Sequence, residues 1–262
     1  MLEGLSGISA KLNVLDWDDR GAIAGEGYDL VINLEDEPET ARLMNSVHAE
    51  RLFGAYETPA AGLSYTADSA GWFDMSLSSR HGRQQADVLK LQNCASYQEL
   101  IFSGLNLEFR GDRYALPSTT PSDLCGDVAI APEAGPVWPM KKWASYDWLK
   151  NELESRGLKV NFLPTRPTLL EHLADVRGHR CVVCADSLPM HLALGSNIPC
   201  VALFNCTSPW EIYGYGILTK LVSPLLAEFF YKRGFDARAT TAISQADVLC
   251  GVLQAIDSKV NV

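Results

Sequence analysis

The amino-acid sequence predicts an α/β protein with a mostly parallel sheet. Short apolar segments of strand length alternate with amphipathic segments of helix length, which is the pattern of parallel α/β folds. The chain has 262 residues, of which 47% are hydrophobic, so it can bury a sizeable core. A stretch rich in Pro, Ser and Thr at residues 116–126 separates two patterned halves. In this class, ligands bind beyond the carboxyl ends of the strands.

The first half begins with a strand after a glycine-rich turn and ends with a long helix. The helix is expected from the spacing of apolar residues such as Val88, Leu91 and Ile101. Between them the sequence is rich in Gly, Ser, Ala and Asp, which is typical of an irregular surface segment. In order, we expect a strand at 28–34, a helix at 39–48, an apolar segment at 52–56, an irregular segment at 60–80 and a helix at 84–104.

The second half has a clearer alternation of strands and helices. Its last helix is expected to begin at Ser244, which forms a capping-box-like pair with Asp247. In order, we expect a strand at 127–131, a helix at 143–156, a strand at 158–163, a helix at 168–176, a strand at 181–185, a helix from 189, a strand at 199–204 and a helix at 244–256.

The charge and the cysteine pattern exclude several function classes. The net charge is −10, from 22 basic and 32 acidic residues, so the chain repels nucleic acids and anionic membranes in general. A bound phosphate must therefore meet a local basic pocket. No apolar run of about 18 residues predicts a membrane span, and the first residues lack the layout of a signal peptide. Seven cysteines, mostly within apolar runs, predict free thiols in a reducing cytoplasm.

Cys181 and Cys184 form a C-x-x-C spacing, which can indicate redox or zinc chemistry. The segment CVVCA is an apolar, β-branched run that predicts a buried strand. Residues three apart on a strand point to opposite faces, so the two thiols cannot share a metal ion. We interpret both as core residues.

The strand at 181–185 leads into the most informative segment of the chain. It is followed by Asp186, by a turn at Ser187 and by a helix that carries His191. Pro189 suits the first turn of that helix, where backbone N–H groups have no intrahelical partner. Those N–H groups and the helix dipole favour a bound diphosphate. The Ser187 hydroxyl and the His191 ring can add further hydrogen bonds.

Several motifs in this region together resemble the heptosyltransferases, glycosyltransferase family 9. The family pattern is a D-[ST]-G-x-x-H-x-A loop and helix, a P-x-V-A-L-F strand and a T-x-P turn. A loop that ends in K-x-W, and a Y-D-L-V-I-[DN] strand in the N-terminal domain, complete it. The chain reads DSLPMHLA at 186–193, PCVALF at 199–204, TSP at 207–209, PEAGPVWPMKKW at 132–143 and YDLVINL at 28–34.

The resemblance covers roughly residues 28–255 and implies a GT-B-like fold with two Rossmann-like domains and mostly parallel sheets. Residues 1–118 correspond to an N-terminal, acceptor-side domain that is shortened relative to the family. Residues 119–262 correspond to the C-terminal, nucleotide-sugar-binding domain.

The implied activity is inverting, metal-independent transfer of a heptose-like sugar from a nucleotide-diphosphate donor, typically ADP-linked. The acceptor is a hydroxyl of a glycan or glycolipid, as in lipopolysaccharide biosynthesis. No cofactor is implied, and contact with a membrane would be peripheral. The residues that the resemblance implies to bind the donor are Asp186, Ser187, Met190 and His191 at the nucleotide and diphosphate, and Lys141 or Lys142 and Thr207 at the phosphates. From its position directly after Pro209 and Trp210, we also expect Glu211 to contact the ribose of the donor.

The chain departs from the family at three places. Leu188 stands where the family has a glycine, which is expected to narrow the approach of phosphate to the backbone. The strand at 158–163 is followed almost at once by the next helix, where the family inserts another helix and strand. The chain also starts about where the family's first βαβ units end, so the loop that carries the family's likely general base is not found. Glu35 and Asp36, after the strand at 28–34, are the candidates to replace it.

Each candidate residue also has a plain structural interpretation. His191 can be a satisfied core histidine, Lys141 and Lys142 a solvated helix start, and the 35–37 segment a solvated acidic turn. Two alternatives to a complete transferase stay open. One is a binding module that keeps the donor pocket but lacks the base. The other is a partial chain that needs a missing N-terminal segment or a partner.

Overall fold

The computed structural model describes residue 5, residues 11–75 and residues 80–257. The chain divides into two compact units. The C-terminal unit contains Asp112–Pro209 and the described residues from Gly214 onward. The N-terminal unit contains Lys11–Gly111 together with the short segment Trp210–Tyr213. The assignment of donor and acceptor roles to the two halves stays a prediction.

The C-terminal unit is built on a five-stranded parallel sheet in the order β5-β4-β6-β7-β8. The parallel register brings the carboxyl ends of β4, β6 and β7 to one edge, where Ala131 pairs with Cys184 and Ala185 with Leu203. This sheet confirms the fold class predicted from the sequence. The strands are β4 (Gly126–Ala131), β5 (Val160–Phe162), β6 (His179–Ala185), β7 (Cys200–Phe204) and β8 (Leu218–Val222).

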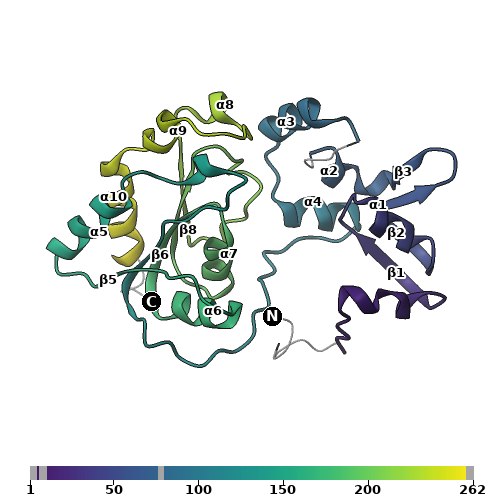
Figure 1. Cartoon of the computed structure of the whole chain (residues 1–262), viewed down its shortest axis with the longest axis horizontal. Helices are drawn as coiled ribbons and strands as arrows, with labels where there is room; N and C mark the ends of the chain where they lie inside the picture. Colours follow the sequence, from purple (N-terminus) through teal and green to yellow (C-terminus); the bar gives the residue numbers. More distant parts are fainter. Residues whose placement is uncertain (1–4, 6–10, 76–79, 258–262) are drawn as a thin grey trace. The chain divides into compact units, whose positions relative to one another are not determined.

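Helices cover both faces of this sheet (Figure 1). On one face, α5 (Tyr146–Ser155) and α10 (Gln245–Asp257) enclose the main hydrophobic core, in which Leu149 and Val252 are fully buried. On the other face lie α6 (Leu169–Arg177) and α7 (Leu188–Gly195). The remaining elements of the unit are η3 (Pro139–Lys141), α8 (Leu226–Phe229) and α9 (Ala237–Thr241).

The N-terminal unit contains a three-stranded sheet in the order β1-β2-β3. β1 and β2 are parallel and joined through α1, whereas β2 and β3 are antiparallel. Gly54 of β2 has φ +120°, and a Cβ there would lie 1.8 Å from the Asn33 carbonyl oxygen, so only glycine fits beside the end of β1. The elements are η1 (Trp17–Ile23), β1 (Gly27–Asn33), α1 (Pro38–Met44), β2 (His48–Thr58), β3 (Gly62–Tyr65), η2 (Ala67–Ser69), α2 (Ala70–Phe73), α3 (Arg83–Gln92) and α4 (Tyr97–Gly104).

Two expectations for this unit are wrong. The predicted helix at 84–104 is two helices, because Ser96 starts α4 with a capping box. The Ser96 hydroxyl accepts from the Glu99 N–H at 3.3 Å, and the Glu99 carboxylate accepts from the Ser96 N–H at 2.7 Å. The segment at 60–80 is not irregular, since it contains β3, η2 and α2, with Phe73 fully buried. Residues 76–79 of that segment lie outside the described residues.

The prediction that Cys181 and Cys184 are core residues of a buried strand is confirmed. Cys181 and Cys184 are fully buried in β6, and the Cys184 sulfur lies 3.8 Å from that of Cys200 in β7. All seven cysteines are free, although Cys94, Cys125 and Cys250 are exposed. Across the described ranges, no helix is long and apolar enough to cross a bilayer.

Candidate functional site

The turn between β6 and α7 is the centre of the candidate site. Ser187 is the N-cap residue of α7 in extended conformation, but its side chain makes no capping hydrogen bond. The hydroxyl instead donates to the Ala185 carbonyl oxygen at 3.2 Å. Pro189 lies in the first turn, as predicted, and has no N–H to satisfy. The first turn of α7 therefore keeps backbone N–H groups without a side-chain cap, which is favourable for an anion.

Lys141, at the end of η3, is held against this turn. Its ammonium donates to the Asp186 carbonyl oxygen at 2.8 Å and to the Asp186 carboxylate at 3.0 Å. Both side chains are mostly buried, at 17% and 16% exposure. An ammonium has three N–H donors, so these two contacts leave one for a ligand.

Lys142 lies in a different environment. Its ammonium pairs with Glu133 at 3.1 Å, and its side chain is 49% exposed. The structure thus separates two adjacent lysines that the sequence leaves equivalent. Only Lys141 joins the β6–α7 turn.

His191 lies on α7 two residues after Pro189 and is partly buried. Its Nδ1 lies 3.1 Å from the Tyr114 hydroxyl, and the two rings meet edge to face. Burial lowers the pKa of His191, Lys141 lowers it further and Asp186 opposes both. A hydroxyl that donates to Nδ1 leaves the proton of a neutral imidazole on Nε2, where it can be donated to a ligand.

The carboxyl end of β7 adds buried polar groups to the same region. Asn205 donates to the carbonyl oxygens of Lys141 and Lys142, at 3.2 and 3.4 Å. Burial raises the pKa of the Cys206 thiol to about 11, with smaller effects from Lys141 and Asp186, so this thiol stays protonated. The Thr207 hydroxyl is buried and has no hydrogen-bond partner within the described part of the chain. An unsatisfied buried hydroxyl is costly, so it marks a place where a ligand oxygen would be stabilising.

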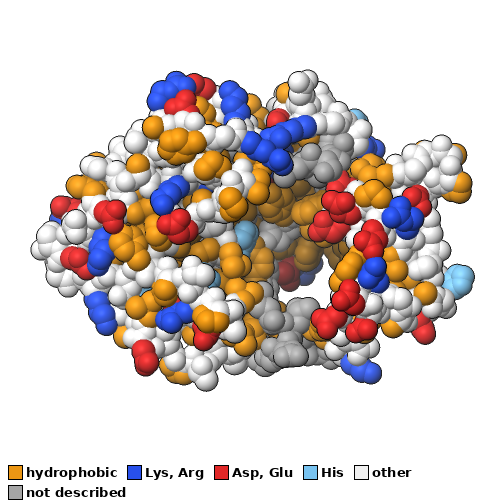
Figure 2. All heavy atoms as spheres, in the orientation of Figure 1, with side chains coloured by type: hydrophobic (Ala, Val, Ile, Leu, Met, Phe, Trp, Pro, Cys, Tyr) orange, Lys and Arg blue, Asp and Glu red, His pale blue; other side chains and the backbone are white. Residues whose placement is uncertain are grey.

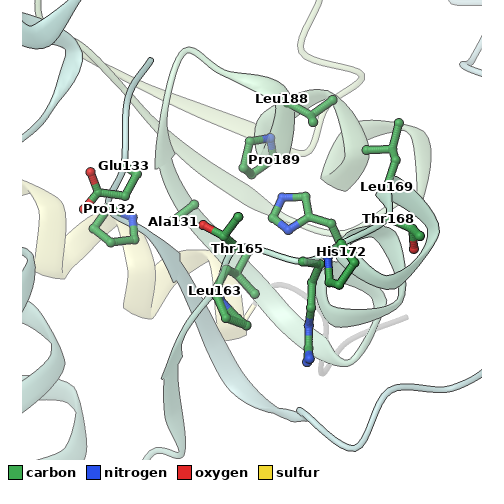
Figure 3. A pocket seen from close by; sticks show the side chains of 13 residues that line it. Ala131, Pro132, Glu133, Leu163, Thr165, Thr168, Leu169, His172, Leu188 and Pro189 are labelled. Atoms are coloured by element: carbon green, nitrogen blue, oxygen red, sulfur yellow. The ribbon is translucent and has the colours of Figure 1, made fainter. Parts of the chain in front are cut away.

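A cavity of about 360 Å³ opens beside the start of α7. It is lined by the carboxyl end of β4, the loop from β5 to α6, and Leu188 and Pro189 of α7. Figure 3 shows the His172 ring projecting from α6 between Thr165 and Pro189. Burial lowers the pKa of His172. A volume of this size is typical of small-molecule sites.

Two further predicted residues of α7 have well-defined places. Leu188 is 46% exposed and lines the cavity, and its φ is not positive, so its side chain causes no backbone strain. Met190 is fully buried in the core of the unit. The fully buried side chain packs within the protein. Its contact with a nucleotide stays a prediction.

Glu211 belongs to the N-terminal unit and is 1% exposed. Its carboxylate pairs with the buried Lys90 ammonium at 3.1 Å and accepts from the Tyr97 hydroxyl at 2.8 Å. Glu211 and the Lys141 cluster therefore belong to different units. Its proposed contact with a donor ribose stays untested.

Glu35 and Asp36 follow the carboxyl end of β1, as predicted. Glu35 is exposed, and its backbone N–H donates to the Asn33 side chain at 3.1 Å. Asp36 is partly buried, and its charge helps to raise the pKa of Tyr65 after the larger effect of burial. Both carboxylates belong to the N-terminal unit, whereas the Lys141 cluster belongs to the other. A role for either in catalysis stays a prediction.

Sequence reasoning missed three participants of the site. Tyr114 precedes the sheet and has no motif around it, and Asn205 directly follows the strand motif at 199–204. His172 lies in the helix expected at 168–176, for which the sequence indicates no functional role. Only the position of Asn205, at the carboxyl end of a predicted strand, was a usable signal. Among the described residues, no group of three or more His, Cys, Asp or Glu side chains is arranged to hold a metal ion.

Comparison with known proteins supports the fold. No protein-family model and no curated protein sequence matches the chain. The crystal structure of a glycosyl transferase family 9 protein from Veillonella parvula DSM 2008 superimposes with a TM-score of 0.53 at 15% identity, covering 88% of this chain and 74% of that one. E. coli heptosyltransferase WaaC with ADP-2-deoxy-2-fluoro heptose gives 0.48 at 15% identity, covering 92% and 75%. The resemblance to family 9 is therefore confirmed at the level of the fold.

Proposed function

We propose that this chain is a glycosyltransferase that binds the diphosphate of a nucleotide-sugar at the N-terminus of α7. The observation that carries the proposal is the position of Lys141, whose ammonium lies against Asp186 at the entrance to that helix. A diphosphate there would meet a helix N-terminus and a fixed cation together. In a chain with a net charge of −10, such a local cation is what an anionic ligand requires.

The remaining groups of the cluster suit the same ligand. The third N–H of Lys141 and the His191 ring can donate to phosphate oxygens. The Ser187 hydroxyl would join them by giving up its hydrogen bond to the Ala185 carbonyl oxygen. Thr207 adds a buried hydroxyl at the end of the neighbouring strand. The cavity at Leu188 and Pro189 adjoins the helix start and offers a place for the nucleoside. The resemblance to family 9 implies an ADP-linked, heptose-like donor.

The proposed reaction transfers the sugar with inversion. A hydroxyl of a glycan or glycolipid acceptor attacks the anomeric carbon as the bond to the diphosphate oxygen breaks, and the diphosphate leaves with the electron pair. Negative charge grows on the leaving group, so Lys141 and the α7 N–H groups stabilise the transition state more than the ground state. The acceptor proton passes to a base, for which Glu35 and Asp36 are the candidates.

The proposal is tested by ligand binding and turnover measured on the same protein. A ligand that binds only the folded state raises the melting temperature, so ADP should raise it in a concentration-dependent way. Release of ADP from ADP-heptose is then followed with and without lipopolysaccharide-core acceptors. Failure of a panel of nucleotides and nucleotide-sugars to shift the melting temperature would refute the donor site. Binding without turnover of any donor would instead favour a non-catalytic binding module or a partial chain.

A further inference from the structure

The C-terminal unit has a second cavity that the proposed donor site does not use. Its volume is about 340 Å³, which is within the range of small-molecule sites. Pro132 and Glu133, just after the carboxyl end of β4, line both this cavity and the one proposed for the nucleoside. In Figure 3 the Glu133 carboxylate points away from the His172 ring. We call the second cavity the Phe235 cavity, after its most exposed lining residue.

The inner wall of the Phe235 cavity is aromatic and fixed. Trp143 and Tyr146 line it, and they are 1% and 3% exposed. Their rings meet edge to face at 5.4 Å within the main hydrophobic core. The Trp143 indole N–H already donates to the Ile243 carbonyl oxygen at 3.0 Å. The indole therefore offers a ligand only apolar contacts, from a wall that is positioned before the ligand binds.

Phe235 also lines the cavity and is 70% exposed, more than any other large hydrophobic side chain in the described ranges. It precedes Asp236, the N-cap residue of α9, where a hydrophobic staple would pack against the fourth helical residue, Thr240. A ring this exposed is not packed as a staple. The backbone is held on both sides, since Gly234 has φ +106° and Arg238 pairs with Asp236 at 2.8 Å. The turn thus presents an apolar ring to solvent at the cavity.

The polar groups of the Phe235 cavity are mainly carboxylates. Glu133 is paired with Lys142 at 3.1 Å. Asp147 is exposed and forms no ion pair with the part of the chain that the structure describes. A carboxylate accepts hydrogen bonds from hydroxyl groups and repels phosphates. In Figure 2 the apolar atoms over α5 and α9 are interspersed with acidic and basic side chains, so they form no continuous patch for a bilayer.

We infer that the Phe235 cavity binds a glycan of neutral sugars. A sugar ring has a face of C–H groups, which packs on an aromatic ring, and an edge of hydroxyl groups, which donate to a carboxylate. Phe235 supplies the first contact and Asp147 the second. A nucleotide fits less well, because its phosphates would meet the Asp147 carboxylate. The use of this cavity as a subsite for the glycan acceptor rests on the proposed function, whereas glycan binding itself does not.

The probes are neutral mono-, di- and trisaccharides of hexoses and heptoses, prepared as methyl glycosides. Saturation-transfer difference NMR on the whole chain without ADP detects their binding and identifies the sugar protons that contact the protein. We expect the strongest transfer at the C–H protons on one face of a ring, because that face packs on Phe235. Titration of the best saccharide then gives its Kd.

Three variants locate the contact, and a fourth is the control. Phe235→Ala should weaken the best saccharide about tenfold or more, whereas Phe235→Trp keeps an aromatic ring and should retain the affinity. Asp147→Ala removes the hydroxyl acceptor and should also weaken it about tenfold. Val222→Ala is the matched control, because Val222 is 41% exposed on β8 and does not line the cavity. Each variant changes an exposed side chain and should melt like the wild type.

Several results would overturn the inference. One is the absence of saccharide binding by the wild type at millimolar concentrations, and another is equal binding by Phe235→Ala. Binding of tetramethylammonium in place of every saccharide would also overturn it, since Phe235 and Asp147 would then form a cation site. Because the assay needs neither donor nor turnover, glycan binding can persist when ADP fails to bind, and the reverse.

The acceptor role is measured separately, by turnover. If the chain transfers sugar, Phe235→Ala should raise the KM for the glycan acceptor about tenfold and leave the ADP affinity unchanged. An unchanged KM would show that the Phe235 cavity is not an acceptor subsite.

Discussion

The Lys141 ammonium donates to both the backbone carbonyl and the carboxylate of Asp186, at 2.8 and 3.0 Å. This double contact fixes the cation at the point where β6 gives way to α7. The two residues lie 45 positions apart in the chain, and Asn205, which follows β7, donates to the carbonyl oxygen of Lys141. Asp186 thus orients the lysine, which in the proposed function is the group that meets the diphosphate of the donor.

The first prediction separates the two neighbouring lysines. Lys141→Ala should weaken ADP binding about tenfold or more, because a charge-assisted hydrogen bond contributes roughly 1.5–3 kcal/mol. Lys142→Ala is the matched control and should change the affinity less than twofold, since Lys142 pairs with Glu133 at the surface. Isothermal titration calorimetry measures both. A larger loss of ADP affinity in Lys142→Ala would contradict the assignment of Lys141 as the phosphate-binding lysine. Unchanged affinity in both single variants and in the double variant would also contradict it.

The second prediction concerns His191. His191→Ala should reduce the ADP-induced rise in melting temperature, because the ring lies on the first turns of α7 and can donate to a phosphate. His191→Asn retains a side-chain donor and should keep more of the shift. Because the ring also contacts Tyr114 at 3.1 Å, Tyr114→Phe tests whether that contact orients it. If ADP raised the melting temperature of His191→Ala as much as that of the wild type, His191 would contribute to packing and not to ADP binding.

The third prediction is a loss of stability as pH falls below about 6.5, the ordinary pKa of histidine. Burial lowers the pKa of His172, His179 and His191, so each binds a proton more readily in the unfolded chain. The unfolded state therefore binds more protons in this window, and the free energy of unfolding rises with pH through it. The stabilisation is complete above the unfolded pKa and is lost progressively as pH decreases.

His179 offers the sharpest test of this pH dependence. It is 4% exposed, with Nδ1 2.7 Å from the Asp175 carbonyl oxygen and Nε2 2.9 Å from the Asn161 amide nitrogen. Protonation of Nε2 would set two donors against each other at that contact. His179→Gln should reduce the fall in melting temperature between pH 7 and pH 5, whereas the exposed His48→Gln should not. Identical profiles for wild type and His179→Gln would disprove the link.

The sequence predicts the sheet of the C-terminal unit because its strands are continuous apolar runs bounded by Gly, Pro and Asp. It also predicts the β6–α7 turn, since Asp186 and Pro189 are local signals. It does not predict β8, a half-exposed edge strand whose sequence LTKLV has weak periodicity. It misses the break at Ser96, where apolar spacing continues through a capping box. Nor can it pair Lys90 with Glu211, because such a contact depends on tertiary folding.

The fourth prediction follows from that buried pair. Lys90→Met should lower the free energy of unfolding by about 3 kcal/mol or more, because it leaves the Glu211 carboxylate buried without its cation. Adding Glu211→Gln removes the unpaired charge and should recover part of the loss. Urea denaturation measures both proteins. A negligible cost of Lys90→Met would show that the pair is not formed. The ribose contact proposed for Glu211 would appear as weaker ADP binding in a folded Glu211→Gln protein.

The last prediction concerns the base, for which Glu35 and Asp36 are the candidates. General-base catalysis typically supplies about 10²–10⁴-fold, while positioning and stabilisation of the diphosphate act without it. If one of these carboxylates accepts the acceptor proton, Glu35→Gln or Asp36→Asn should lower the rate of sugar transfer within that range and leave ADP affinity unchanged. Glu37→Gln is the matched control, since Glu37 is exposed in the same turn. Transfer rates that neither substitution changes would remove both residues from the mechanism. If Glu37→Gln lowered the transfer rate equally, the combined negative charge of the acidic turn would be responsible. A general base acts through one positioned carboxylate oxygen, whereas an electrostatic field is the sum of all the charges in the turn.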